Sequence, residues 1–187
     1  KEKDVDVLDA PVSGGGPDVA MAKGMTALVG GDKEVLERAR SVIESMGKGI
    51  SHCGKTGDGM AVKVINNYAG FVIFDLFFEA MSVAAKEGLD LNVMWERFAN
   101  NLLGPLFKNF LPSRALVGNF DPLFTIDLEY KDVKLAMDEA KEMGVPAYHG
   151  ALSLERLVEA RAKGLGQKDV TAIALLWEEL LNIKIRL

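Results

Sequence analysis

Residues 57–67 read Gly57-Asp-Gly-Met-Ala-Val-Lys63-Val-Ile-Asn-Asn67, two glycines that lead into a hydrophobic stretch carrying a lysine and, four residues later, an asparagine. Residues at positions i and i+4 share one face of a helix, so Lys63 and Asn67 are expected to point at the same small target. The glycines leave the backbone open to a ligand, and Asp58 is a candidate cap for the helix N-terminus, whose free N–H groups favour an anion. The stretch therefore predicts a binding or catalytic site at the start of a helix.

The hydrophobic stretch runs from Met60 to Ala85 and is apolar on nearly every side, which predicts a helix that is buried all round. Lys63, Asp75 and Glu79 interrupt it before it reaches the roughly 20 clean apolar residues that a membrane span needs. Polar side chains on a buried helix cost free energy unless they are paired or used. We therefore expect a core or subunit-interface helix with a polar spot reserved for chemistry; a plain turn followed by a solvated lysine is the alternative interpretation.

The composition is that of an ordered, soluble, globular protein: 187 residues, 49% hydrophobic, 26% charged, with 19 glycines. The net charge of −5 and the lack of a basic cluster argue against nucleic acid as the main partner. The single cysteine, Cys53, fits a reducing cytoplasm. One cysteine and two histidines are too dispersed to make a zinc ligand set, so no metal site is expected.

The first part of the chain alternates short hydrophobic runs with glycine-rich turns, which is typical of an α/β sheet. The expected elements are strands at residues 5–12, 25–31 and 50–53, and an amphipathic helix at residues 32–46 that Asp32 caps. Ser13-Gly14-Gly15-Gly16-Pro17 follows the first strand directly. Backbone N–H groups at the carboxyl end of a strand can approach an anion, although a plain flexible turn explains these residues equally well.

These elements are too few for a complete α/β domain, because about 55 residues make too small a core. No strand followed by Gly-x-Gly-x-x-Gly, the dinucleotide fingerprint, occurs in the chain. Residues 1–56 are therefore predicted to be the C-terminal remnant of a Rossmann-type, NAD(P)-binding domain whose N-terminal part is missing.

From residue 57 onward the periodicity is helical. After the long helix, which Gly88 stops, the expected helices cover residues 91–103 with Asp90 or Asn92 as the cap, 107–116 with Pro112 as a possible break, 124–143, 147–163, and 169–181 with Asp169 as the cap. No internal repeat is present. The fold class is thus mainly α, with residues 57–187 forming one all-helical domain that starts with a long interdomain helix.

Five motifs occur in order along the chain: Asp9-Ala-Pro-Val-Ser-Gly-Gly15, Val29-Gly-Gly31, Gly57-x-Gly59-x-x-x-Lys63-x-x-x-Asn67, Lys131-Asp132-Val-x-Leu-Ala136 and Gly164-x-Gly166-x-x-Asp169. This series resembles the β-hydroxyacid dehydrogenases, the family of 3-hydroxyisobutyrate dehydrogenase and 2-hydroxy-3-oxopropionate (tartronate semialdehyde) reductase, over the whole chain. The resemblance implies a Rossmann domain that holds NAD or NADP, followed by a helical domain, like the C-terminal domain of 6-phosphogluconate dehydrogenase, that closes the site and dimerises through its long helix.

The resemblance also implies roles for the residues that match the family motifs. Lys63 matches the catalytic acid/base, Asn67 a substrate-binding residue, and Ser13, Gly14 and Gly15 the segment that grips the carboxylate and hydroxyl end of the substrate. On the cofactor side, Lys131 matches a cofactor-contacting lysine and Phe124 an aromatic residue near the nicotinamide. Asp132 is a candidate for orienting a lysine in the site.

The expected activity is hydride transfer between NAD(P) and a short 3-hydroxy acid or semialdehyde acid, by a cytoplasmic dimer or tetramer without nucleic acid or membrane partners. An enzyme like 6-phosphogluconate dehydrogenase is an alternative, disfavoured because Met60 stands where that branch has a histidine. A non-catalytic oligomerisation scaffold of the same fold is the other alternative, and Lys63, which such scaffolds lose, is present. For the 187 residues alone, we expect assembly without turnover.

Overall fold

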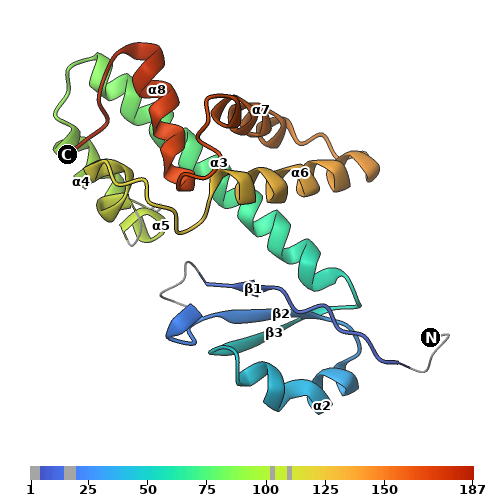
Figure 1. The fold of residues 1–187 in the computed structure, drawn as a ribbon. Helices are drawn as coiled ribbons and strands as arrows, with labels where there is room; N and C mark the ends of the chain where they lie inside the picture. Colours follow the sequence, from blue (N-terminus) through green and yellow to red (C-terminus); the bar gives the residue numbers. More distant parts are fainter. Residues whose placement is uncertain (1–4, 15–19, 102–103, 109–110) are drawn as a thin grey trace. The chain divides into compact units, whose positions relative to one another are not determined.

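The structure, a computed structural model, describes residues 5–14, 20–101, 104–108 and 111–187 (Figure 1). The chain divides into two compact units, residues 1–68 and 69–187. The division falls inside the long helix α3 (Asp58–Lys86), so that the first turns of α3 belong to the first unit.

The first unit is a three-stranded sheet in the order β1-β2-β3 with one helix packed against it (Figure 1). Its elements are β1 (Val12–Ser13), β2 (Thr26–Gly30), α2 (Lys33–Glu44) and β3 (Gly49–Gly54). The parallel pair β2 and β3 is joined through α2, and β1 runs antiparallel to β2. The core lies between α2 and the sheet, where Val29 meets Leu36 and Ile43. The strands predicted at 25–31 and 50–53 and the helix capped by Asp32 are confirmed, since the Asp32 carboxylate accepts from the Glu34 N–H at 2.7 Å.

The predicted strand at residues 5–12 is wrong over most of its length. Only Asp9, which forms a bridge with Gly30, and residues 12–13 pair with β2. Val5 and Val7 are 63% and 61% exposed. Their alternating pattern has nothing to pack against, because none of the described residues forms a strand beside residues 5–8.

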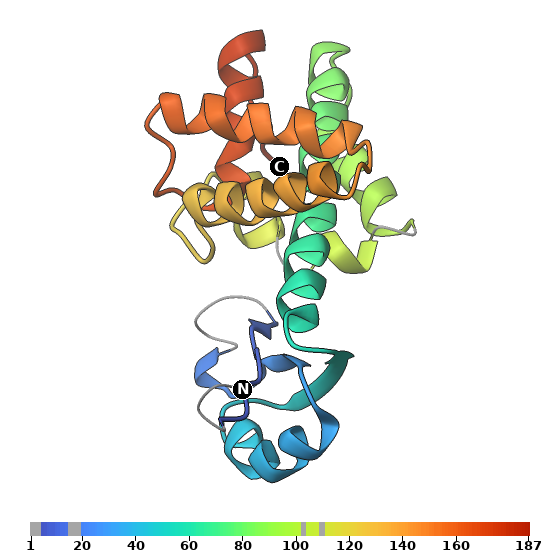
Figure 2. The same ribbon diagram turned by 90° about the vertical axis from the view of Figure 1, so that its right-hand side faces the viewer.

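The second unit is helical and confirms the mainly α fold class. After the C-terminal part of α3 come α4 (Leu91–Ala99), α5 (Gly104–Lys108), the short 3-10 helices η1 (Leu111–Ser113) and η2 (Ala115–Val117), α6 (Ile126–Glu142), α7 (Tyr148–Ala162), η3 (Val170–Ile173) and α8 (Ala174–Leu181). The helices α6 and α7 lie side by side and antiparallel, as Figure 2 shows. Asp90 caps α4 by accepting from the Asn92 N–H at 2.8 Å, as one of the two predicted caps.

Two predicted helices of this unit are broken into shorter pieces. In place of the helix predicted at 107–116, residues 107–108 end α5 and residues 111–116 contain η1 and part of η2. Pro112 lacks an N–H group and cannot continue an α-helix, and residues 109–110 lie outside the described part. Residues 169–181 begin as η3 and become α-helical only from Ala174. The predicted helix at 91–103 ends at Ala99, and residues 102–103 lie outside the described part.

The core of the second unit is aromatic. The Phe77 ring lies 5.2 Å from Phe78, 5.1 Å from Phe98 and 4.7 Å from Phe107, centroid to centroid, and 6.3 Å from Trp95. These rings come from α3, α4 and α5, and their tilted and edge-on contacts are the favourable geometries for aromatic pairs. They hold the three helices together around α3.

The prediction that α3 is buried all round is wrong. A stripe of its apolar side chains is exposed, including Ile65, Leu76 and Val83. By length and composition alone α3 is long and apolar enough to cross a membrane, although part of it is buried within the chain's own structure. A single helix of this kind is weak evidence for a span, because the core helix of a soluble protein passes the same test.

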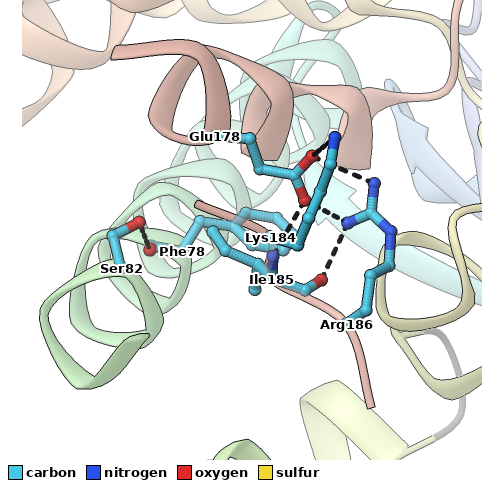
Figure 3. A network of polar contacts seen from close by, with 6 residues as sticks. All are labelled: Phe78, Ser82, Glu178, Lys184, Ile185 and Arg186. Atoms are coloured by element: carbon cyan, nitrogen blue, oxygen red, sulfur yellow. Dashed lines mark hydrogen bonds and ion pairs between the residues drawn. The ribbon is translucent and has the colours of Figure 1, made fainter. Parts of the chain in front are cut away.

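The C-terminal residues are fixed to α8 by one buried carboxylate (Figure 3). Glu178 is 4% exposed and accepts from the Ile185 N–H at 2.9 Å, from Lys184 Nζ at 3.2 Å and from the Arg186 guanidinium. The adjoining Leu187 N–H donates to Leu116 O at 3.0 Å. Glu178 therefore gathers two cations and a backbone donor at the end of the chain.

Replacing Glu178 by glutamine is expected to destabilise the second unit by roughly 1–3 kcal/mol, because the partly buried Arg186 guanidinium loses its counter-charge. Both tryptophans, Trp95 and Trp177, lie in this unit, so urea unfolding followed by fluorescence reports on it. Glu179→Gln is the matched control, since Glu179 is exposed and pairs only at the surface with Lys163. Equal losses of stability in the two variants would contradict the role of Glu178.

Candidate functional site

The N-terminus of α3 is capped by a carboxylate from the start of the chain. Asp9 accepts from the Gly57 N–H at 2.6 Å and from the Met60 N–H at 2.8 Å, one oxygen for each donor. The predicted cap, Asp58, is instead the first residue of α3 and accepts from the Lys55 N–H at 2.9 Å, closing the turn before the helix. The prediction of Asp58 as the cap is therefore wrong, and the anion that the helix N-terminus favours is a side chain of this protein.

The glycines around this cap allow backbone segments to approach closely. A Cβ atom on Gly59 would lie 2.3 Å from Leu28 O and 2.8 Å from an Asp9 carboxylate oxygen, and one on Gly30 would lie 2.3 Å from the other Asp9 oxygen. Gly57 has a φ of +99°, a conformation that few other residues adopt. Gly59 thus makes room for β2 and Asp9, where the sequence alone indicated room for a ligand.

Replacing Asp9 by alanine is expected to destabilise the start of α3 by about 1–2 kcal/mol, the usual effect of losing an N-cap. Hydrogen exchange at the Met60 and Gly57 amides measures this directly, and both are expected to lose protection. In the control variant, Asp58→Ala, the Lys55 amide is expected to lose protection and the Met60 amide to keep it. The reverse pattern would restore Asp58 as the cap.

Lys63, on the second turn of α3, reaches the first residue of β1. Its Nζ donates to Val12 O at 2.9 Å, and the side chain is half-buried. Val12 is followed at once by Ser13 and Gly14, which are part of the predicted substrate-gripping segment. The cap fixes α3 next to this segment, because Asp9 lies only three residues before Val12. The structure therefore brings the predicted catalytic lysine to the segment predicted to hold the substrate, although 51 residues separate them.

The other predicted substrate residues are placed as follows. Asn67 lies one turn beyond Lys63 on α3 and is likewise partly buried, which agrees with a shared face. Ser13 ends β1, and Gly14 has a φ of +149°. Gly15 lies outside the described residues.

The predicted cofactor residues belong to the second unit. Lys131 lies on α6 and donates through Nζ to the Asp132 carboxylate, so the lysine that Asp132 contacts is Lys131. The Lys131 side chain is 56% exposed, whereas that of Asp132 is 2% exposed. Phe124 is half-buried and immediately precedes Thr125, whose hydroxyl caps α6 by accepting from the Leu128 N–H at 3.2 Å.

A third charged residue of α6, Glu129, is buried on the same helix. It lies in a buried apolar stripe with Ile126 and Val133, is 5% exposed, and its Oε1 has no hydrogen-bond partner among the described residues. Burial, and then the nearby Asp132 carboxylate, raise the pKa of Glu129 to about 8, and Lys131 acts in the opposite direction. At neutral pH most of this carboxyl group is protonated.

Sequence reasoning missed Asp9 and Glu129. Asp9 was in a quoted motif, but nothing local shows that its partner amides lie about 50 residues away. Glu129 had a local signal, since it is a charged residue in an apolar stripe with helical spacing. Within the residues that the structure describes, no group of three or more His, Cys, Asp or Glu side chains is placed to hold a metal ion.

Two family models match the chain, one on each side of the start of α3. Residues 57–177 match the family described as the NAD-binding domain of NADP-dependent 3-hydroxyisobutyrate dehydrogenase. Residues 1–57 match the NAD-binding domain of 6-phosphogluconate dehydrogenase. The two matches meet at Gly57, where the turn into α3 begins.

Individual relatives match nearly the whole chain. A 2-(hydroxymethyl)glutarate dehydrogenase from Eubacterium barkeri is 33% identical over 98% of the chain and 61% of its own length. The 2-hydroxy-3-oxopropionate reductase of Escherichia coli is 31% identical over 96% of the chain and 61% of its own length. A solved structure of Mycobacterium tuberculosis 3-hydroxyisobutyrate dehydrogenase with L-serine has a TM-score of 0.80 at 32% identity, over 90% of this chain and 60% of that one.

The chain thus spans about three fifths of the length of the relatives that it matches. The helical unit matches one family over most of its length, and the sheet unit matches a nucleotide-binding domain. With its lysine-bearing helix following directly on that sheet, the chain belongs to the β-hydroxyacid dehydrogenase family.

Proposed function

We propose that the protein carrying this chain is an oxidoreductase that transfers a hydride between NAD(P) and a short 3-hydroxy acid or semialdehyde acid. The observation that carries the proposal is the hydrogen bond from Lys63 Nζ to Val12 O, at the entrance to the Ser13–Gly14 segment. The names of the relatives support the substrate class, because each describes a short acid with a hydroxyl or oxo group.

In the proposed reaction Lys63 is the general acid and base. As an ammonium it donates a proton to the new alkoxide when a semialdehyde is reduced, and as an amine it accepts the hydroxyl proton when the acid is oxidised. NAD(P), when bound, supplies or accepts the hydride. Ser13, Gly14 and Gly15 are proposed to bind the substrate's carboxylate and hydroxyl end through backbone and hydroxyl donors, and Asn67 to bind the substrate one helical turn from Lys63.

The residues of the second unit fit one side of a dinucleotide. More than half of the Lys131 side-chain surface is exposed, and its ammonium donates to the buried Asp132 carboxylate, which holds it in position. The cation is therefore available to an anionic group of the cofactor. Phe124 offers an aromatic surface at the start of α6. We propose both as cofactor contacts, with residues 1–56 as the end of the dinucleotide-binding domain and 57–187 as the helical domain.

The test uses the chain joined to a complete dinucleotide-binding domain, assayed with NAD and with NADP against short 3-hydroxy acids and semialdehydes. 3-Hydroxyisobutyrate, D-glycerate and L-serine form the first panel, with 6-phosphogluconate as the competing substrate. Turnover of a short acid supports the proposal and identifies the cofactor. Turnover of 6-phosphogluconate alone, or of nothing in the panel, would reject it.

The 187 residues alone are expected to assemble and to show no turnover, because the pyrophosphate of a dinucleotide needs the Gly-x-Gly-x-x-Gly turn that no strand of this chain carries. Light scattering after gel filtration measures assembly, and an NADH absorbance assay measures turnover. Oxidation of 3-hydroxyisobutyrate or D-glycerate by these residues alone would contradict the expectation.

We further propose that the enzyme is a cytoplasmic dimer or tetramer formed through the exposed apolar stripe of α3. Leu76 and Val83, seven residues apart, are 57% and 61% exposed and lie on one face of the helix. Exposed apolar surface of this kind is typical of an interface between subunits. A Leu76→Lys variant that remains folded is expected to shift the protein toward the monomer.

A further inference from the structure

Asp169 is a fully buried carboxylate whose hydrogen bonds reach the turn before α6. It is 0% exposed. One carboxylate oxygen accepts from the Leu123 N–H at 3.0 Å and from the Phe124 N–H at 3.5 Å. The other accepts from the Thr171 N–H at 3.1 Å and from the Thr171 hydroxyl at 2.7 Å. A side chain that was predicted only to cap the last helix therefore holds two backbone donors from a segment about 45 residues earlier.

The backbone on both sides of Asp169 adds to this connection. The Asp169 N–H donates to Phe120 O at 3.1 Å, and the Val170 N–H donates to Phe124 O at 2.8 Å. From the other direction, the Ile126 N–H donates to Lys168 O at 3.0 Å. Residues 120–126 and 168–170 thus lie side by side as two short extended segments. The Asp169 carboxylate reaches from the second segment to the backbone of the first.

We propose that Asp169 is a positioning residue for the cofactor side of the site: its carboxylate fixes the turn that carries Phe124 and that starts α6, the helix of Lys131. This inference rests on the proposed function, in which Phe124 and Lys131 contact the cofactor. The charge matters because four donors converge on two oxygens in a site closed to water, where an unpaired donor is costly.

Asparagine at position 169 keeps the shape of the side chain, but only one of its two terminal atoms can accept hydrogen bonds. In one orientation its amide NH₂ faces the Leu123 and Phe124 N–H groups, and in the other it faces the Thr171 N–H. Either orientation leaves a buried backbone donor without an acceptor. The Thr171→Val variant separates the two ends of the carboxylate, because it removes only the hydroxyl donor and leaves Leu123 and Phe124 their acceptor.

The experiment compares Asp169→Asn with Thr171→Val and with Glu178→Gln, a second buried carboxylate of the same unit that serves the C-terminus. Hydrogen exchange on the chain measures the Leu123 and Phe124 amides, and kinetics of the protein with its complete dinucleotide-binding domain measure KM for the cofactor and for the hydroxy acid. In Asp169→Asn, protection of the two amides is expected to fall, and KM for the cofactor to rise about tenfold, the effect of one unpaired buried donor. KM for the hydroxy acid is expected to stay within about twofold, since Lys63 and Ser13 belong to the first unit.

The two control variants are expected to lose stability without a change in cofactor KM. A cofactor KM in Asp169→Asn that matches a control variant of equal stability, or unchanged protection at Leu123 and Phe124, would overturn the positioning role. Absence of any NAD(P)-dependent turnover in the unsubstituted protein would instead overturn the proposed function, and the amide protection would still show whether Asp169 holds the turn.

Discussion

Replacing Lys63 by alanine in the protein with its complete dinucleotide-binding domain is expected to lower kcat by about 10²- to 10⁴-fold, the usual contribution of a positioned general acid or base. KM for the hydroxy acid is expected to change far less, because Ser13 and Gly14, the proposed substrate segment, are unchanged. The fall in kcat is expected from the position of Lys63, whose Nζ lies 2.9 Å from the O atom of Val12, the residue that precedes the proposed substrate segment. Steady-state kinetics in both reaction directions measure the effect.

Arginine at the same position is expected to restore the positive charge but little of kcat. A guanidinium holds its proton at any working pH and cannot act as the base that oxidation requires. Lys86→Ala is the matched control, because Lys86 ends the same helix and also donates to a backbone oxygen, Leu181 O, at 3.0 Å. A kcat in Lys63→Ala equal to that of Lys86→Ala would reject Lys63 as the acid/base and favour the oligomerisation scaffold.

The elements that depend on neighbouring residues were predictable from the sequence. Asp32 and Asp90 cap their helices as predicted, because the cap and the amide that it accepts from are two residues apart. Helix α6 also begins close to its predicted start, where the Thr125 hydroxyl reaches the Leu128 N–H. In each of these places a hydrogen bond between neighbouring residues marks the start of the helix.

Contacts between distant residues were not predictable. Asp58 was a plausible local cap for α3, yet Asp9 has that role. Its bridge with Gly30 on β2 places the carboxylate at the helix end, and Gly30 and Gly59 leave the space for it. Likewise Asp169 was correctly predicted as a cap, but its second set of partners lies in another segment. The strand predicted to start at Val5 was wrong for a related reason. Its alternating pattern is that of a strand, but none of the described residues forms a strand beside it, and Val5 is exposed.

In the candidate site, too, local features were predictable from the sequence and contacts between distant residues were not. Residue types and their order predicted Lys63, Asn67 and the Ser13–Gly14 segment as site residues, and the motif spacing placed the first two on one helical face. The hydrogen bond between Lys63 and Val12 could not be predicted from the sequence, because the two residues are 51 positions apart, with two strands and a helix between them. Glu129 needed it too, because only packing shows that the side chain faces the core and finds no partner there.

Replacing Glu129 by glutamine is expected to stabilise the second unit at alkaline pH and to leave it nearly unchanged at pH 5. Burial raises the pKa of Glu129 from 4.5 to about 8, so the folded chain keeps a proton that the unfolded chain releases. The favourable contribution of protonated Glu129 is complete below pH 4.5, falls as the pH rises toward 8, and is flat above it. Glutamine is neutral at every pH and escapes this loss.

The difference in unfolding free energy between Glu129→Gln and the unsubstituted chain is expected to grow from near zero at pH 5 to on the order of 3–4 kcal/mol at pH 8, from about 1.4 kcal/mol for each unit of pKa shift. Tryptophan fluorescence in urea at a series of pH values measures it, since Trp95 and Trp177 both report on this unit. Glu142→Gln, an exposed change at the end of the same helix, is expected to give a flat difference. A flat difference for Glu129→Gln as well would mean that the buried carboxyl is ionised in the folded chain, with Lys131 then the cation placed to compensate it.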